Sequence, residues 1–243
     1  MTKLDKTILF ENEQVVAVNK PAGVLSIPDR FDQHLPSMSK MLQQKYGQVF
    51  VVHRIDRDTS GVLLFAKDRQ AHEILSKQFE SREIEKYYYA LVNGRLSATA
   101  GRIESAIAPH PGKPGKMTVS KKGKPAISEY EVMETFALFS WLKIQIQTGR
   151  THQIRVHMQS IGHPVVMDEL YGVDNPIFLS SLKRRYHLGK HDKEERPLLK
   201  RLALHAAIIR FRMPGSDVLC TIEAPLPKDL HATLQQLRKL RPD

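Results

Sequence analysis

One short polar segment combines side chains that can act as an acid, a base or a nucleophile. Residues 53–61 read HRIDRDTSG and are followed by the apolar run 62–66. Loops at strand ends often carry functional side chains. Here Asp56 stands between Arg54 and Arg57, whose charges would stabilise the carboxylate at neutral pH. From the spacing alone, a turn-capping aspartate beside solvated arginines is the simpler interpretation.

The sequence partly matches three known functional motifs, but each match lacks a required residue. Residues 56–61 match the opening of an EF-hand calcium loop, but its twelfth position is Lys67 in place of the required glutamate. The HRID tetrad also occurs in kinase catalytic loops, yet no glycine-rich loop precedes it and no Asp-Phe-Gly follows. The lysine-rich residues 112–124 lack the Gly-Lys-Ser/Thr ending of a P-loop.

A second cluster, residues 148–158 (TGRTHQIRVHM), is expected at the start of a helix. His152 and Arg155 are three residues apart and would share a face of that helix. Arg150 and Arg155 suit recognition of phosphate or carboxylate groups. His152 and His157 are five residues apart and cannot share a face, which disfavours a metal site. The plainer interpretation is a basic first turn that serves only solubility.

A third cluster, residues 85–90 (EKYYYA), carries three consecutive tyrosines. In a strand, Tyr88 would face opposite to Tyr87 and Tyr89. Packing in the core explains at least one of these rings. An aromatic ring beside arginines is also what a pocket that stacks a nucleic-acid base requires.

The periodicity of the sequence predicts the elements that must position these clusters. Strands predominate without regular alternation with helices, so we expect an α+β fold with a mixed, largely antiparallel sheet and flanking helices. The predicted elements are a hairpin over 8–19, helices over 37–46, from 68, over 150–161 and from 227, and strands over 62–66, 84–92, 126–136, 142–146, 202–211 and 219–222.

Composition and charge limit the class of protein. The 243 residues suffice for one large domain or two small ones, and we expect a single domain over residues 1–243. The 37 basic and 26 acidic residues give a formal charge of +11, so nucleic acid is the first partner to test. The single Cys220 fits a reducing compartment, and no apolar run is long enough for a signal peptide or a membrane span. We therefore expect a cytoplasmic protein.

Two charged segments interrupt the predicted elements and are expected to be surface loops. Residues 174–200 carry charges of both signs. Residues 109–125 hold several lysines and no acid, and we expect them to contact a nucleic-acid backbone; a solvated loop is the alternative. These lysines are Lys113, Lys116, Lys121, Lys122 and Lys124.

Taken together, the clusters resemble the RluA family of RNA pseudouridine synthases. Residues 53–61 are similar to the family signature HRLDxxTSG, with Ile55 in place of leucine. Further segments match family motifs in family order, across about residues 8 to 225. They are residues 19–23 (NKPAG), 86–90 (KYYYA), 148–157, 162–164 (GHP) and 204–206 (LHA). Many relatives carry an N-terminal S4 RNA-binding domain, but in this sequence the family motifs begin almost at once, so we expect the catalytic domain and its loops to select the target.

The resemblance implies a role for each residue type. Asp56 would be the catalytic aspartate, Tyr88 the tyrosine that lies on the target base, and Arg155 the basic partner of the aspartate. Arg54 would fill the gap that the extruded base leaves. Together with Arg57, Arg150, His152 and the five lysines, Arg54 is expected to bind RNA.

The implied reaction isomerises uridine to pseudouridine and needs no cofactor and no metal. Asp56 could attack C1′ or remove the C2′ proton, and the sequence does not choose between these. The expected partner is structured ribosomal or transfer RNA, with no membrane, no obligate protein partner and a monomeric chain. The alternatives are a non-catalytic RNA-binding or RNA-remodelling protein, and a hydrolase, which would need a metal or a second carboxylate.

Overall fold

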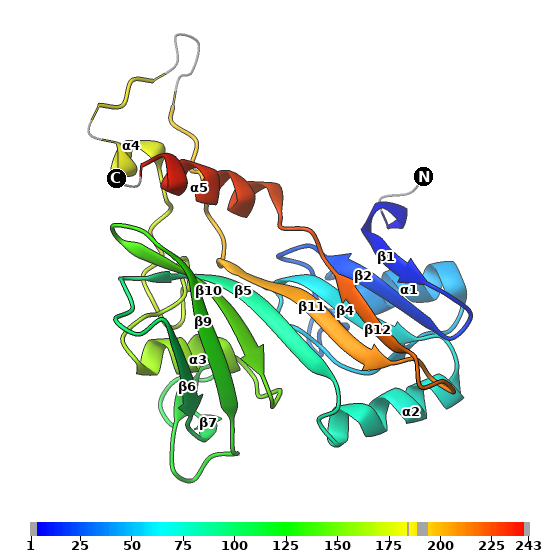
Figure 1. Ribbon diagram of the computed structural model, residues 1–243. Helices are drawn as coiled ribbons and strands as arrows, with labels where there is room; N and C mark the ends of the chain where they lie inside the picture. Colours follow the sequence, from blue (N-terminus) through cyan, green and yellow to red (C-terminus); the bar gives the residue numbers. More distant parts are fainter. Residues whose placement is uncertain (1–3, 184, 189–193, 241–243) are drawn as a thin grey trace.

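A computed structural model describes residues 4–183, 185–188 and 194–240 (Figure 1). Within them, ten strands form one sheet whose main path runs β1-β2-β4-β11-β5-β10-β9-β6, with β12 beside β11 and β3 beside β4. The ten strands are β1 (Ile8–Glu11), β2 (Val15–Lys20), β3 (Phe50–Val51), β4 (Ser60–Ala66), β5 (Glu85–Asn93), β6 (Ala100–Glu104), β9 (Ile127–Thr135), β10 (Phe139–Ile146), β11 (Leu204–Arg212) and β12 (Leu219–Glu223).

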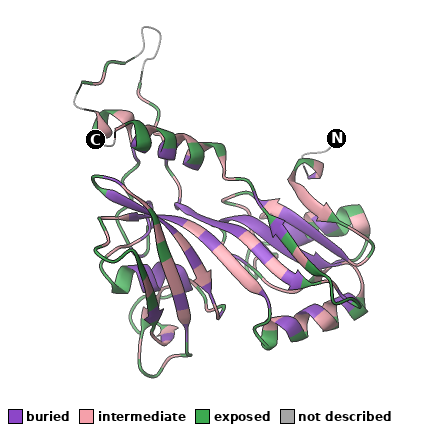
Figure 2. Cartoon of the chain, viewed as in Figure 1, coloured by how far each residue is buried: buried purple, intermediate pink, exposed green. Residues whose placement is uncertain are grey.

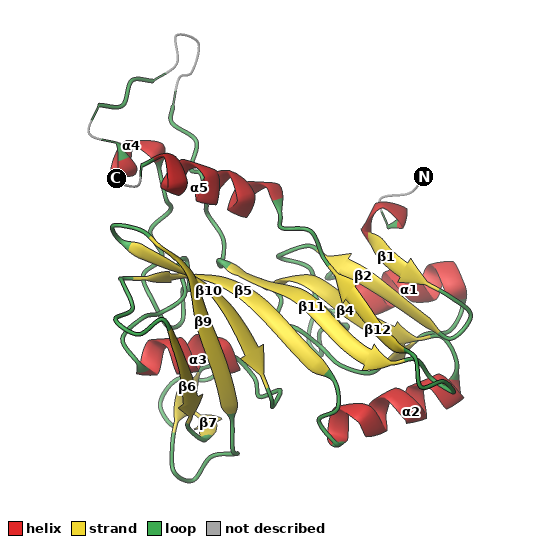
Figure 3. Ribbon diagram, in the orientation of Figure 1, coloured by secondary structure: helices red, strands yellow, loops and turns green. Residues whose placement is uncertain are grey.

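Every pairing in this sheet is antiparallel except that of β4 with β11. The expected α+β fold with a mixed, largely antiparallel sheet is therefore confirmed (Figure 3). Gly61 permits the parallel pair, because it is paired with Ala206, has φ +116° and would place any Cβ against the Ala206 carbonyl oxygen.

The helices are α1 (Met38–Tyr46), α2 (Arg69–Glu80), α3 (Gln153–Ser160), α4 (Leu179–Leu182) and α5 (Lys228–Lys239), with a short 3-10 turn at Asp5–Thr7. Side chains cap the starts of α1 and α2: the Ser37 hydroxyl accepts from the Lys40 amide at 3.4 Å, and Asp68 accepts from the Ala71 amide at 2.8 Å.

Helices α1 and α2 cover opposite faces of the N-terminal part of the sheet. Met38 and Leu42 of α1 pack with one set of alternate strand residues, such as Leu63, whereas Leu75 of α2 packs with the other, such as Leu64. Strand β4 is therefore buried on both faces, which explains its continuous apolar sequence. Figure 2 shows the buried residues along the strands and the exposed residues on the outer sides of the helices.

Two expectations need correction. Helix α3 begins at Gln153 and not at Arg150, because His152 adopts the left-handed conformation with φ 55° and cannot continue a helix. The lysine-rich segment is not wholly a loop, since β7 (Ile107–Pro109) and β8 (Met117–Val119) pair as a separate antiparallel hairpin. In the other charged segment, residues 184 and 189–193 lie outside the described residues.

Candidate active site

The loop that carries Asp56 joins β3 to β4 and is fixed at both sides of the aspartate. Before it, Ser26 Oγ donates to the Ile55 carbonyl at 2.7 Å and accepts from the Ile55 amide at 3.1 Å. After it, the Arg57 carbonyl accepts from the Gly23 amide at 2.9 Å, and Arg57 Nε donates to the Gly23 carbonyl at 3.2 Å. The 21–26 segment therefore holds the Asp56 loop in place.

Lys20 also joins the 21–26 segment to the Asp56 loop. Its fully buried Nζ donates to the carbonyls of Pro21 at 3.0 Å, Val24 at 2.6 Å and Arg57 at 2.8 Å. Burial lowers the pKa of Lys20 to about 7, although the negative charges of Asp58 and Asp56 act in the opposite direction. The sequence places Lys20 in the NKPAG motif of residues 19–23, but only the structure shows that its side chain joins two loops.

Arg155 on α3 connects Asp56 to a second carboxylate that the sequence analysis did not identify. Its Nη1 lies 3.5 Å from Asp56 Oδ2, while its Nε and Nη2 donate to the two oxygens of Asp168 at 2.7 and 2.8 Å. Asp168 is fully buried and also accepts from the amides of Leu170 and Tyr171, both at 3.1 Å. Burial lowers the pKa of Arg155, but the hydrogen bonds and charge of Asp168 outweigh this and raise it.

His152 faces the same carboxylate from the turn before α3. Its Nε2 lies 3.9 Å from Asp56 Oδ2, and its Nδ1 shares a hydrogen bond of 2.8 Å with Tyr171 Oη. Burial lowers the pKa of His152, which the charge of Asp56 opposes. Tyr171 Oη also accepts from the Met117 amide of β8 at 2.7 Å. Tyr171 therefore links the lysine-bearing hairpin to the surroundings of Asp56, a connection that the sequence analysis did not identify.

Tyr88 enters the site from the middle of the sheet. It is paired with Ile144 on β10 and Ala206 on β11, and its side chain is buried. Burial, followed by the negative charge of Asp56, raises the pKa of Tyr88, so the phenol is neutral at physiological pH. Its neighbours make contacts of their own: Tyr87 Oη donates to Glu85 at 2.8 Å, and the Tyr89 ring stacks on Trp141 at 5.5 Å.

Three hollows meet at Asp56. The largest encloses about 380 Å³ and is lined by Arg54, Arg57 and Arg150. A smaller one of about 70 Å³ contains Tyr88, His152 and Arg155, with apolar walls from Ile146, Ile154 and Leu204. The third encloses about 340 Å³ beside Met167, Lys200 and Arg201. A carboxylate, a guanidinium and an aromatic ring therefore surround an apolar slot with a basic entrance, which suits a planar base attached to a phosphate backbone.

The structure thus brings seven predicted site residues into one cleft: Arg54, Asp56, Arg57, Tyr88, Arg150, His152 and Arg155. The five predicted lysines lie apart from it. Lys122 and Lys124 line a neighbouring hollow of about 420 Å³ that Arg150 also borders. Lys113 and Lys121 are exposed, and Lys116 Nζ lies 5.1 Å from the centre of the Tyr171 ring.

A polar network supports the end of the loop at β4. Ser60 Oγ lies 2.9 Å from His205 Nδ1 and 3.5 Å from Arg201 Nη1, and Arg201 forms two hydrogen bonds of 2.6 and 2.7 Å with Asp229. His205 Nε2 shares a hydrogen bond of 3.2 Å with the Ala224 carbonyl, so Nδ1 is left to accept from Ser60. Burial lowers the pKa of His205 to about 4.

The part of the chain that the structure describes contains neither a metal-binding cluster nor a membrane-spanning helix. No three histidine, cysteine, aspartate or glutamate side chains in residues 4–183, 185–188 and 194–240 are grouped so that they could hold a metal ion. In the same part of the chain, no helix has the length and apolar character needed to cross a membrane.

Comparison with known proteins identifies relatives over most of the sequence. The model of a family described as RNA pseudouridylate synthase matches residues 14–160. The dual-specificity RNA pseudouridine synthase RluA of Vibrio vulnificus is 37% identical over 90% of this chain and 82% of that protein. The ribosomal large subunit pseudouridine synthase D of Nitrosomonas europaea is 35% identical over 96% of this chain and 65% of its own length.

Solved structures share the fold. Human RNA pseudouridylate synthase domain containing 4 superposes with a TM-score of 0.72 at 22% identity, over 97% of this chain and 94% of that one. Human RNA pseudouridylate synthase domain containing 1 gives a TM-score of 0.68 at 26% identity, over 98% and 96% of the two chains.

Proposed function

The chain belongs to the RNA pseudouridylate synthase family, and we propose from this premise that it isomerises particular uridines in structured ribosomal RNA, transfer RNA or both. One relative is named as a dual-specificity enzyme and another as an enzyme of the large ribosomal subunit. The formal charge of +11 and the arginines at the entrance of the cleft support a polyanionic substrate.

The reaction exchanges one bond to the sugar for another. The N1–C1′ bond of uridine breaks, the base turns, and a C5–C1′ bond forms. The C5 proton is lost and N1 is protonated, so atoms balance without a redox carrier. Asp56 starts this sequence by attacking C1′ or by removing the C2′ proton. Arg155 Nη1, 3.5 Å away, places a positive charge beside the carboxylate that either route uses.

Tyr88 is proposed to lie against the target base. Its raised pKa keeps it a neutral phenol, which favours stacking over a role as the base that takes the C5 proton. The target must leave its stack, at a cost of a few kcal/mol. Arg54, exposed at the entrance of the cleft, would offset part of this cost by occupying the vacated position.

The observation that carries the proposal is the convergence of Asp56, Arg155 and Tyr88 on one hollow. Release of tritium from RNA labelled at uridine C5 tests it, because the isomerisation breaks the C5–H bond, whereas RNA binding and hydrolysis of the N1–C1′ bond leave it intact. We expect tritium release together with a pseudouridine at a defined position. RNA binding without tritium release would instead indicate a non-catalytic RNA-binding protein, and free uracil would indicate a hydrolase.

We further propose that the chain acts as a single catalytic unit, as a monomer without an obligate protein partner, in the cytoplasm. One sheet contains strands from both halves of the chain, with β11 between β4 and β5, and this supports a single unit. The single cysteine supports a reducing compartment. Light scattering of the purified protein at micromolar concentration tests the monomer, and a dimer mass would contradict it.

A further inference from the structure

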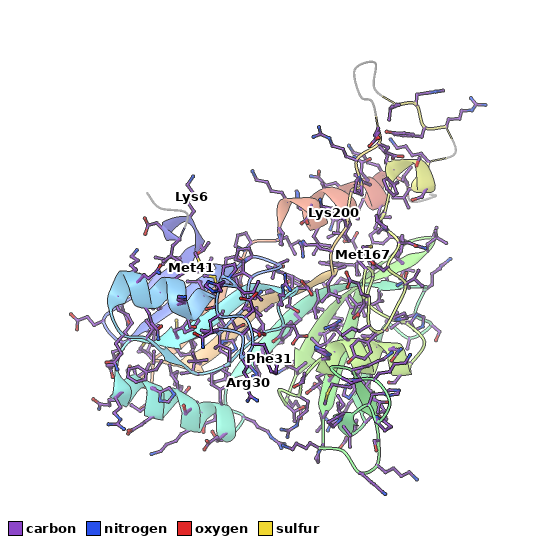
Figure 4. All side chains as sticks on the ribbon, turned by 180° about the vertical axis from the view of Figure 1, so that it is seen from behind. Lys6, Arg30, Phe31, Met41, Met167 and Lys200 are labelled. Carbon is purple, nitrogen blue, oxygen red and sulfur yellow. The ribbon has the colours of Figure 1, made fainter. Side chains whose placement is uncertain are left out.

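The most exposed large apolar side chain among the described residues is an aromatic ring. Phe31 is 97% exposed, and the next such side chain, Val218, is 66% exposed. Phe31 lies between β2 and α1, and Figure 4 shows it near Arg30, between the blue-to-cyan N-terminal part of the chain and the green strands. An isolated exposed apolar residue is ordinary on a protein surface, so its surroundings must decide whether it has a role.

Hydrogen bonds within the loop fix the backbone on both sides of the Phe31 side chain. Asp29 Oδ1 accepts from the Phe31 amide at 2.8 Å and from the Asp32 amide at 3.1 Å. These bonds lower the pKa of the Asp29 carboxyl. At the base of the loop, the Leu25 amide donates to the Pro36 carbonyl at 3.2 Å, and the Leu25 carbonyl accepts from Met38 at 2.9 Å. The loop is thus closed at its base and turned at its tip, which limits collapse of the ring onto the protein.

The same loop borders the cleft of Asp56. Asp29 and Arg30 line the hollow of about 380 Å³ together with Arg54, Asp56 and Arg150. Ser26, near the start of the loop, makes the two hydrogen bonds that fix Ile55 beside the aspartate. Phe31 is therefore one residue beyond the wall of the hollow, on a loop whose base is joined to the Asp56 loop.

The chemistry around Phe31 favours a nucleic-acid base over a protein partner. The neighbours Arg30, Asp32, Gln33 and His34 are polar and exposed, so the ring is not part of an apolar patch large enough for a stable protein interface, which needs about 800 Å² on each side. Arg30 and Arg54 can hold phosphates on the cleft side of the ring. An unpaired base offers a flat π face that stacks on an aromatic side chain whatever its sequence.

We propose that Phe31 is a stacking platform for an unpaired RNA base that flanks the target uridine, and that this contact selects targets in single-stranded loops over targets in continuous helices. The inference rests on the proposed function, because the cleft must first hold RNA. It assigns a specificity-determining residue outside the cluster of Asp56, Tyr88 and Arg155.

Kinetics of tritium release on a stem-loop RNA that the wild type modifies provide the test. We expect Phe31→Ala to raise KM by about 5-fold to 100-fold with kcat changed less than about 2-fold, since stacking contributes to binding more than to the chemical step. Phe31→Tyr should restore the wild-type KM because it retains the ring. Leu138→Ala is the matched control, since Leu138 is also exposed, at 60%, but lies in the turn between β9 and β10.

An abasic nucleotide in the RNA identifies the partner of the ring. Placed at the flanking position, it should weaken binding to the wild type and cause no further loss in Phe31→Ala. An unchanged KM in Phe31→Ala, or equal losses from abasic RNA in both proteins, would overturn the proposal. A change of oligomeric mass in Phe31→Ala would instead assign the ring to a protein interface. Absence of tritium release by the wild type would reject the proposed function, and the binding measurements would still test the stacking contact separately.

Discussion

Arg155 donates two hydrogen bonds to Asp168, at 2.7 and 2.8 Å, but approaches Asp56 with a single nitrogen at 3.5 Å. The buried pair therefore fixes the guanidinium, and Asp56 receives its charge without being held tightly by it. A carboxylate in a strong bidentate pair would be a poorer nucleophile or base, because its lone pairs would be occupied. This arrangement leaves the oxygens of Asp56 free to react.

Asp56→Asn should abolish isomerisation and leave RNA affinity nearly unchanged. The amide retains size and polarity but cannot act as a nucleophile or base, so turnover should fall at least about 100-fold. Tritium release and filter binding measure the two properties. Asp58→Asn, which changes an exposed carboxylate two residues away, is the control. Retention of more than about a tenth of the activity in Asp56→Asn would exclude the catalytic role.

Arg155→Ala should lose more activity than Arg150→Ala. Arg155 is buried and contacts both Asp56 and Asp168, whereas Arg150 Nε donates only to the Pro125 carbonyl, at 3.0 Å, at the rim of the cleft. Removing one partner of a buried ion pair typically costs about 3–5 kcal/mol of stability. Turnover must therefore be measured at a temperature where circular dichroism shows both variants to be folded. Equal losses would contradict the proposed role of Arg155.

Acidification should destabilise the protein through His205. Burial lowers the pKa of this ring to about 4 in the folded state, compared with 6.5 in the unfolded chain. Between these values only the unfolded state binds the proton, so the free energy of unfolding falls as the pH falls from 6.5 to about 4. His53, whose Nε2 accepts from the Leu64 amide at 3.0 Å and whose pKa burial lowers to about 3, acts in the same direction.

Urea unfolding at several pH values measures this effect. We expect His205→Gln to reduce the slope of unfolding free energy against pH in that window, because the proton uptake of one group is removed. His231→Gln, at an exposed position of α5, is the control and should leave the slope unchanged. An identical slope in wild type and His205→Gln would remove His205 from the acid response.

Gly61→Ala should unfold or strongly destabilise the protein. The added Cβ would overlap the Ala206 carbonyl oxygen, which is backbone and cannot move without separating β4 from β11, and φ +116° is itself strained for alanine. Thermal unfolding measures the loss. Gly149→Ala is the control, since a Cβ there meets nothing within 4 Å. A melting temperature close to that of the wild type would show that the strands can separate at little cost.

Replacing the five lysines of residues 109–125 with alanine should weaken the salt dependence of RNA binding. If each of Lys113, Lys116, Lys121, Lys122 and Lys124 neutralised one phosphate, the slope of log K against log salt would become shallower by up to about 3.5. A four-lysine variant that retains Lys116 controls for the contact of that residue with the Tyr171 ring. An unchanged slope would mean that the hairpin stays in solvent.

Local sequence features predicted local structure well. The helix starts predicted at residues 37 and 68 coincide with the N-caps Ser37 and Asp68 of α1 and α2, and period-two alternation separates Tyr88 from its neighbours. These features depend on residues within a few positions of one another, so the sequence alone is enough to predict them.

Long-range relationships in the site were not predictable in the same way. The role of Asp168 depends on Arg155 of another element, and the hydrogen bond from Lys20 to the Arg57 carbonyl joins positions 37 residues apart. The left-handed conformation of His152 arises where the chain must turn into α3, and nothing in its residue type demands it. Burial and partners that arise only from tertiary packing account for each of these differences.

The position of β11 between β4 and β5 determines the order in which the protein can be assembled during synthesis. Strands 60–66 and 85–93 are made early, but they are not neighbours, and the strand that separates them spans residues 204–212. Asp56 and Tyr88 therefore cannot reach their final relationship until more than four-fifths of the chain has been translated. Until then β4 and β5 present unpaired edges, and a nascent chain stalled before residue 204 is exposed to misfolding and aggregation.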